Sequence, residues 1–247
     1  QGHPASQIEV VEPWAEAREA LRKNYGIEAQ AEAGPALQRA QIVVWAVKPQ
    51  TFRDAAAQAK AHTQGALHLS VAAGIRSDSI AQWLGTERIV RTMPNTPALV
   101  GKGMSALYAR PAVSAPERQS IEAIMATTGE FLWVDSEPQL DAVTALSGSG
   151  PAYVFYFLEA MTRAGTDMGL TAAQAHQLAV GTFVGASELA RRSDETPAVL
   201  RQRVTSKGGT TYAALQSMEH DAVAEKFMQA MQAARQRAHE LGDEFGK

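Results

Sequence analysis

The chain reads Ile-Val-Val-Trp-Ala-Val from Ile42 to Val47, then a helix-like stretch from Phe52 to Ala61, then a second apolar run from Leu67 to Ala72. Runs that are apolar on both faces and alternate with helices are typical of a parallel sheet covered on both sides. The alternation continues outward in both directions. Further strands are predicted at Ile8–Val11, Ile89–Met93, Met104–Tyr108 and Phe131–Val134, and further helices at Ala15–Tyr25, Ser77–Leu84 and Ala115–Thr127. The first part of the chain is therefore predicted to be an open α/β domain.

The strand signal stops after Asp135, and the remainder reads as helices alone. We expect two domains, residues 1–135 and 136–247. The predicted helices are Leu140–Leu146, Pro151–Met168, Thr171–Arg191, Pro197–Val204, Thr210–Ser217 and Val223–Glu240. The second and third of these carry apolar faces too wide for a domain of this size to bury alone, so the all-α C-terminal domain is predicted to form a dimer.

The composition is that of an ordinary globular protein: 247 residues, 45% apolar, 20% charged and a net charge of -3. Nothing in it indicates a basic nucleic-acid surface or a membrane span, so neither partner is expected and a cytoplasmic location is the prediction. The chain has no cysteine, which excludes disulfides and thiolate chemistry. The histidines lack ligand spacing, and no metal site is predicted. They are His3, His62, His68, His176, His220 and His239.

The segment from Val204 to Leu215 reads Val-Thr-Ser-Lys-Gly-Gly-Thr-Thr-Tyr-Ala-Ala-Leu, a hydroxyl- and glycine-rich loop that runs into an apolar helix. Gly208 and Gly209 lack a Cβ, so backbone N–H groups can turn toward a ligand. A helix that starts at Thr210 leaves its first N–H groups unpaired and slightly positive. The segment predicts an anion site, with an ordinary helix cap after a turn as the alternative.

Five blocks together resemble one enzyme family. They are Ala46–Gln50, Val71–Gly74, Met93–Gly101, Leu146–Tyr153 and Val204–Leu215. In this order they resemble pyrroline-5-carboxylate reductase, over nearly the whole chain. The resemblance implies an NAD(P)H-dependent oxidoreductase that reduces the cyclic imine 1-pyrroline-5-carboxylate to L-proline, the last step of proline biosynthesis. Lys207 departs from the family pattern, which more often has proline there.

The predicted cofactor contacts lie at the carboxyl ends of the strands, where an open parallel sheet binds its ligand. Small residues there allow a flat nicotinamide and its ribose to approach the backbone. The residues of the family blocks at these ends are Ala46, Val47, Lys48, Pro49, Ala72, Ala73, Gly74, Met93, Pro94 and Asn95.

A Rossmann-like dinucleotide domain opens with a strand, a G-x-G-x-x-G/A turn and a helix, followed about 20 residues later by an acidic residue at the ribose. We expect the first strand and glycine loop to lie upstream of Gln1, with Glu12 as the acidic residue. Gly101–Ala106 and Gly148–Gly150 fail as substitutes because neither follows a strand and opens a helix. Glu12 favours NADH, whereas Arg18 offers a counter-charge to a 2′-phosphate. The cofactor is NADPH or NADH, with NADPH favoured by resemblance.

The predicted substrate site takes its carboxylate on the backbone N–H groups of Gly208, Gly209 and Thr210. Ser206 bridges toward the cofactor, Lys207 attracts the carboxylate, and Thr211, the predicted catalytic residue, bonds the ring nitrogen. Ser147, Ser149 and Gly150 are expected to line the same pocket. No general acid is evident, and a protonated imine needs mainly positioning beside a hydride donor.

Two alternatives stay open at this point. One is another imine or β-hydroxyacid reductase of the same two-domain plan, although those that use a lysine acid are disfavoured because Leu140–Leu146 has no lysine. The other is a non-catalytic ligand-binding module without a cofactor loop. The sequence upstream of Gln1 would discriminate between them. In each case the expected partners are a small molecule and a second copy of the chain.

Overall fold

The computed structural model describes residues 4–246. His3 therefore lies outside the described residues. Contacts divide the described chain into two compact units, one of residues 4–149 with 234–246 and one of residues 150–233. The predicted functional division at residue 135 stays a prediction.

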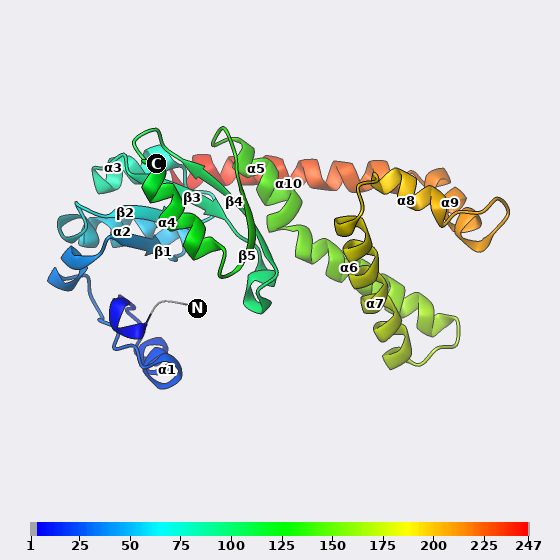
Figure 1. Cartoon of the computed structure of the whole chain (residues 1–247), viewed down its shortest axis with the longest axis horizontal. Coiled ribbons are helices and arrows are strands. Elements are labelled where there is room, and N and C mark those ends of the chain that lie inside the picture. The colour runs from blue at the N-terminus through cyan, green and yellow to red at the C-terminus, as the bar shows by residue number, and fades with distance from the viewer. Residues whose placement is uncertain (1–3, 247) are drawn as a thin grey trace. The chain divides into compact units, whose positions relative to one another are not determined.

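The first unit contains a five-stranded sheet in the order β1-β2-β3-β4-β5 (Figure 1). Its strands are β1 (Ile42–Trp45), β2 (Leu67–Ser70), β3 (Ile89–Met93), β4 (Gly103–Ala109) and β5 (Gly129–Trp133). β1, β2 and β3 are parallel neighbours, as are β4 and β5. The predicted Rossmann-like α/β architecture is confirmed, with one exception in strand direction.

β4 runs antiparallel to β3, whereas the sequence pattern predicted a wholly parallel sheet. The connection explains the difference. Only residues 94–102 separate the two strands, and they form a short 3-10 helix, Thr96–Val100, that ends at Gly101 with φ 69°. A parallel crossover needs a dozen or more residues, so a link this short returns the chain in the opposite direction.

Helices cover both faces of the sheet (Figure 1). On one face α2 (Pro49–Ala59) and α3 (Ser77–Leu84) enclose a core that includes Trp45, Phe52 and Ile80. On the other, α4 (Ala115–Met125) covers a second core, with Ile121 and Met125 packed against Leu67, Leu69, Val90 and Leu107. The central strands β2 and β3 are buried on both faces, whereas the edge strands β1 and β5 expose Val44 and Leu132.

The predicted strand Ile8–Val11 is wrong. Residues 8–11 form only an isolated parallel bridge, Val11 with Gln30, outside the sheet. The Glu12 N–H donates to the Gln30 carbonyl, and the Gln30 N–H donates to the Val10 carbonyl. These bonds join the apolar run to a polar segment, and the run pairs with none of the five strands of the sheet. α1 (Ala15–Tyr25) follows, as predicted.

The remaining helices are close to those predicted, with changes at several of their ends. They are α5 (Gln139–Val143), a π-helix (Thr144–Gly148), α6 (Gly150–Asp167), α7 (Ala172–Arg192), α8 (Pro197–Arg203), α9 (Thr210–His220) and α10 (Val223–Phe245), with short 3-10 helices at Ala5–Gln7, Pro35–Arg39 and Lys60–His62. Leu140–Leu146 is thus α-helical at first and π-helical later, and α10 continues beyond Glu240. Thr171 forms the predicted N-cap, as part of a capping box with Gln174.

Among the described residues of the second unit, all regular secondary structure is helical. Gly165 of α6 lets Ala175 of α7 approach so closely that a Cβ at residue 165 would lie 2.8 Å from the Ala175 Cβ. Tyr153 and Phe157 pack edge-on against Phe227, with ring centroids 5.5 and 5.8 Å apart. Large apolar side chains of α6 and α7 stay exposed: Val154, Phe155, Tyr156, Met161, Leu178, Val184 and Leu189. None of the described helices is long and apolar enough to cross a membrane.

Candidate active site

The carboxyl ends of β1, β2 and β3 meet at one edge of the sheet. Trp45 pairs with Ser70, and Ser70 pairs with Arg91, so β1 and β2 end level with each other and β3 continues to Met93. The Val71 N–H extends this register by donating to the Trp45 carbonyl at 3.1 Å. The predicted cofactor residues of the three strands therefore lie side by side, as a strand-end cluster comprising residues 46–49, 72–74 and 93–95.

Within this cluster, β1 leads into an open helix start. Lys48 is the N-cap of α2 and Pro49 its first residue, and no side chain caps the helix. The Lys48 carbonyl accepts bonds from the Thr51 N–H at 3.0 Å and the Thr51 Oγ1 at 3.1 Å. Pro49 has no N–H and the Thr51 N–H is engaged, so the Gln50 N–H is the first-turn donor left to meet an electronegative ligand group.

The turn after β2 is compact and presents its backbone. Ala72 is buried, while Ala73 and Gly74 are half-buried. The Ala72 N–H donates to Ser70 Oγ at 3.3 Å. Gly74 has φ 72°, a left-handed conformation that favours glycine. A residue with a Cβ would be strained there.

Asn95 links three elements at the end of β3. Its Nδ2 donates to the Ser147 carbonyl at 3.1 Å, and its Oδ1 accepts from the Met104 N–H at 2.9 Å. Beside it the Met93 side chain fills the space where a Cβ of Gly148 would stand, 2.6 Å from the Met93 Cε. Ser147 and Gly148 of the π-helix are thereby brought to the strand-end cluster. A π-helical turn at a functional site is a recurring feature, and the sequence pattern did not indicate it.

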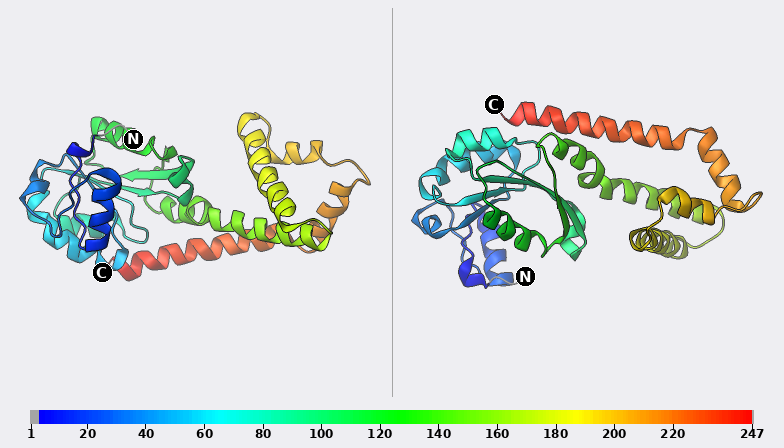
Figure 2. Two further views of the ribbon diagram at one scale, coloured as in Figure 1. Left: turned by 90° about the horizontal axis from the view of Figure 1, so that it is seen from below. Right: turned by 45° about the horizontal axis from the view of Figure 1, so that its top comes forward.

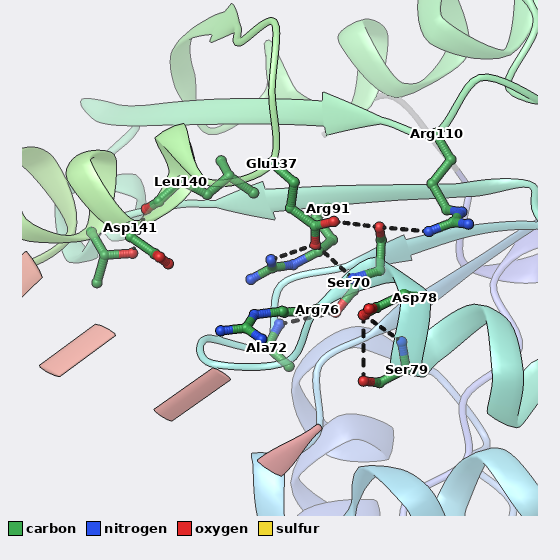
Figure 3. Close-up of polar contacts among 12 residues, drawn as sticks. Ser70, Ala72, Arg76, Asp78, Ser79, Arg91, Arg110, Glu137, Leu140 and Asp141 are labelled. Atoms are coloured by element: carbon green, nitrogen blue, oxygen red, sulfur yellow. Dashed lines mark hydrogen bonds and ion pairs between the residues drawn. The ribbon is translucent and has the colours of Figure 1, made fainter. Parts of the chain in front are cut away.

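A buried polar network stands behind the cluster, and sequence reasoning missed it. Glu137 accepts from Arg91 Nη1 at 2.7 Å, and from the Ser77 N–H and Oγ, each at 2.6 Å. Arg110 Nη1 donates to Ser77 Oγ at 3.1 Å. In Figure 3 the Glu137 carboxylate lies beside Arg91. The start of α3 is therefore occupied by a protein carboxylate, whereas the start of α2 is open. No local pattern signals this network because its members are far apart in sequence.

Glu12 lies outside the sheet, before α1. Its carboxylate accepts from the Trp14 N–H at 2.9 Å. Arg18 Nη1 donates to the carbonyls of Glu12 at 2.9 Å and Pro13 at 2.7 Å. The structure thus brings Glu12 and Arg18 together, but no contact joins Glu12 to the strand-end cluster among the residues described.

The predicted substrate loop, Ser206–Thr211, belongs to the helical unit. Gly208 has φ 76°, Gly209 is the N-cap of α9, and Thr210 is its first residue, as the sequence predicted. The Gly209 N–H donates to the Ser206 carbonyl at 3.0 Å. A Cβ at residue 209 would lie 2.6 Å from Ser206 Oγ, so only glycine leaves that hydroxyl in place.

The start of α9 has no side-chain cap. Its first-turn amides, beginning at Thr210 and Thr211, therefore point toward the loop without an intrahelical acceptor. Both threonine side chains are exposed in the single chain, as are Lys207 and Gly208. This arrangement suits an anion such as a carboxylate. Ser149 and Gly150 lie at the start of α6, and Ser149 N–H donates to the Thr144 carbonyl at 2.8 Å.

The strand-end cluster fits the nicotinamide half of a dinucleotide: small side chains, a left-handed glycine and an uncapped helix start lie together. Both internal glycine patterns are excluded as phosphate loops, as expected. Gly101 ends a 3-10 helix and Gly103 opens β4, while Gly148–Gly150 joins the π-helix to α6. No G-x-G-x-x-G turn joins a strand to a helix within residues 4–246. That part of the chain also holds no cluster of metal-binding side chains.

Comparison with known proteins gives this arrangement a family. Residues 137–241 match the family model described as pyrroline-5-carboxylate reductase dimerisation, and residues 1–74 match one described as NADP oxidoreductase, coenzyme F420-dependent. The pyrroline-5-carboxylate reductase of Pseudomonas aeruginosa is 43% identical over 249 residues, covering 100% of this chain and 91% of that protein.

Solved structures agree. A pyrroline-5-carboxylate reductase from Coxiella burnetii superposes with a TM-score of 0.90 at 35% identity, covering 97% of this chain and 90% of its own. The Plasmodium falciparum pyrroline carboxylate reductase, solved with NADP bound, superposes with a TM-score of 0.82 at 29% identity, covering 89% of this chain and 84% of its own. The uncapped start of α9, the strand-end cluster and the similarity over nearly the whole chain agree with one another. The chain belongs to the pyrroline-5-carboxylate reductase family.

Proposed function

We propose that the protein reduces 1-pyrroline-5-carboxylate to L-proline with NADPH or NADH. The observation that carries the proposal is the 43% identity to a named reductase over the whole of this chain. The geometry supports it at both ends of the reaction, since the strand-end cluster offers a nicotinamide surface and the start of α9 offers an anion site.

The substrate carboxylate is held at the uncapped start of α9. In the structure the Gly209 N–H is engaged by the Ser206 carbonyl. The N–H groups of Gly208, Thr210 and Thr211 are then the donors best placed for the carboxylate, and Gly209 contributes by leaving room for Ser206 Oγ. Lys207 adds positive charge beside them, and the Thr211 hydroxyl bonds the ring nitrogen. These roles are proposals.

The reduced nicotinamide supplies a hydride to C5 of the imine, and the ring nitrogen, protonated from solution, becomes the secondary amine of proline. Among residues 4–246, no side chain beside the start of α9 is assigned as the proton donor. The residues of the protein hold the carboxylate and the ring so that C5 faces the cofactor.

The strand-end cluster positions the cofactor. Ala46, Val47, Lys48 and Pro49, then Ala72, Ala73 and Gly74, then Met93, Pro94 and Asn95 form its proposed contacts. Both polar atoms of Asn95 are committed to Ser147 and Met104, so its proposed role is to set the shape of the surface. Ser147, Ser149 and Gly150 line the substrate side.

Glu12 and Arg18 contact the adenine ribose of the cofactor, where NADPH carries its 2′-phosphate. Two backbone carbonyls hold the Arg18 guanidinium beside Glu12, which supports tolerance of a 2′-phosphate. We therefore place NADPH ahead of NADH. We also propose a homodimer built on the helical unit, because the matched family model describes dimerisation, and a cytoplasmic location, for which cell fractionation is the test.

The direct test uses the full-length protein with pyrroline-5-carboxylate and each reduced cofactor. We expect oxidation of NADPH or NADH with an equal amount of proline formed, measured by absorbance and by amino-acid analysis. Omission of the imine is the control. A folded protein that binds the cofactor and yields no proline would refute the proposal.

A further inference from the structure

The end of α10 packs onto the turn after β2 (Figures 1 and 2). The α10 tail, defined as residues 239–246, belongs to the same compact unit as the sheet. A Cβ on Gly74 would lie 2.9 Å from the Leu241 Cβ and 3.4 Å from Phe245 Cδ2. Phe245 also packs against the core beneath α2 and α3. The backbone of the turn therefore rests directly on these two side chains.

Polar contacts fix the tail in place beside this packing. Arg76 Nη2 lies 2.7 Å from Asp243 Oδ1 and donates to the His239 carbonyl at 3.4 Å. Ser79 Oγ donates to the Gly246 carbonyl at 3.0 Å. Gly242 makes room for Arg76, because a Cβ there would lie 2.9 Å from Arg76 Nε. Figure 3 shows Arg76 and Ser79 on the loop and helix that receive the tail.

Ala72 anchors one end of the turn in the core, and few polar contacts fix the rest. One bond, Ala72 N–H to Ser70 Oγ, is at the long end of the normal range, and Gly74 is the residue with the widest choice of backbone conformations. Contact with Leu241 selects among these conformations. A turn that forms part of a binding surface must be held within a fraction of an ångström, and a packed supporting residue does this.

We propose that the α10 tail positions the Ala72–Ala73–Gly74 turn for the nicotinamide cofactor, with Leu241 as the main positioning residue. The inference rests on the proposed function in that the turn must contact the cofactor. The affinity for NADPH then depends on the α10 tail, although the tail touches neither cofactor nor substrate.

The test is NADPH affinity of the full-length protein, measured by fluorescence titration without substrate. Leu241→Ala is expected to raise the Kd for NADPH by about three- to tenfold, as a displaced binding surface does, with the KM for pyrroline-5-carboxylate unchanged. Leu241→Met, which fills the same space, is expected to keep the wild-type Kd. Asp243→Asn, at an exposed position of the tail, removes the carboxylate charge that pairs with Arg76 and lies 4.0 Å from His239 Nε2, and is expected to raise the Kd by about twofold.

The matched control is Leu37→Ala. Leu37 packs against the same core from a 3-10 helix elsewhere in the unit, so its truncation also removes core packing. Its Kd for NADPH is expected to equal that of the wild type. A merely structural tail would instead give the two Leu→Ala variants equal effects, and that result would overturn the proposal.

A double-mutant cycle identifies the route of the effect. Gly74→Ala places a Cβ 2.9 Å from the Leu241 Cβ and weakens NADPH binding, and adding Leu241→Gly, which deletes that Leu241 Cβ, relieves the steric part, so the two changes are expected to be non-additive. Strict additivity, or an unchanged Kd in Leu241→Ala, overturns the positioning role and leaves the proposed reaction intact. A wild-type protein that binds NADPH but makes no proline removes the proposed reaction, while the Kd comparison still decides the positioning role.

Discussion

Thr211 stands in the first turn of α9, directly after the first helical residue, where its hydroxyl is beside the uncapped amides. We expect Thr211→Val to lower kcat/KM for pyrroline-5-carboxylate by about ten- to a hundredfold, the value of one hydrogen bond of ~1–3 kcal/mol. Valine keeps the shape and the β-branch. Steady-state kinetics and a thermal unfolding curve check the prediction together.

Thr210→Val is the control for this change. If Thr210 acts through its backbone N–H, its hydroxyl can be removed with a smaller loss. Wild-type kinetics in Thr211→Val combined with a sharp fall in Tm would mean that Thr211 only supports the helix start and that another group bonds the ring nitrogen.

His68 is a second residue with a measurable role, in stability. It is buried in β2, where Nδ1 accepts from the Trp45 Nε1–H at 2.9 Å. The pKa of His68 is lowered to about 4, mainly by burial; a hydrogen bond to the Thr63 backbone opposes the shift, and the charge of Arg88 adds to it. Below its ordinary pKa of 6.5 the unfolded chain takes up a proton there that the folded chain refuses.

The stability that His68 contributes is therefore complete above pH 6.5 and falls as the pH drops toward 4. The total loss is about 3 kcal/mol. Urea unfolding at pH 7.5 and pH 5 should show a smaller decline for His68→Gln than for the wild type. The same substitution at exposed His220 is the control, and equal declines in the wild type and His68→Gln would contradict the prediction.

Among elements, the Glu137 network joins α3, β3 and the segment before α5. Glu137→Ala leaves the Arg91 guanidinium, whose side chain is 10% exposed, without its carboxylate. We expect the free energy of unfolding to fall by about 3 kcal/mol. Glu87→Ala is the comparison, because that carboxylate pairs with Arg110 at 60% exposure and should cost less than about 1 kcal/mol. Chemical denaturation of both variants measures the difference.

The elements themselves were largely predictable from periodicity, whereas their pairing was not. The runs at β1, β2 and β3 identify strands because each is short, rich in apolar residues and separated from the next by a helical pattern. The direction of β4 depends on the length of the link from Met93 to Gly103, and the exclusion of Ile8–Val11 from the sheet depends on which neighbour it finds. Pairing of this kind is decided by tertiary contacts, which one sequence window does not contain.

The predicted site divides in the same way. Loop chemistry is local, so the left-handed Gly208 and the helix start at Thr210 follow from the segment alone. The roles of Asn95, Glu137 and Leu241 depend on partners tens of residues away, and no spacing rule identifies them.

At the scale of the whole molecule, the exposed apolar faces of α6 and α7 predict a dimer interface. Leu178 is 60% exposed and Leu189 59%. Leu178→Glu is expected to shift the protein from dimer to monomer by placing a charge in the interface. Sedimentation at low concentration measures this, with Gln119→Glu on exposed α4 as the control. A wild-type protein that remains a compact, folded monomer would overturn the prediction.

The sheet unit is completed by two segments of chain, residues 4–149 and 234–246, with the whole helical unit between them. On the ribosome, the strands and their flanking helices emerge first, and the site that receives Phe245 stays open while the helical unit is synthesised. Leu241 and Phe245 close it only after residues 234–246 have left the exit tunnel. Nascent chains interrupted before that point expose a patch of core to chaperones and proteases, so the turn after β2 gains its packing only when synthesis is complete.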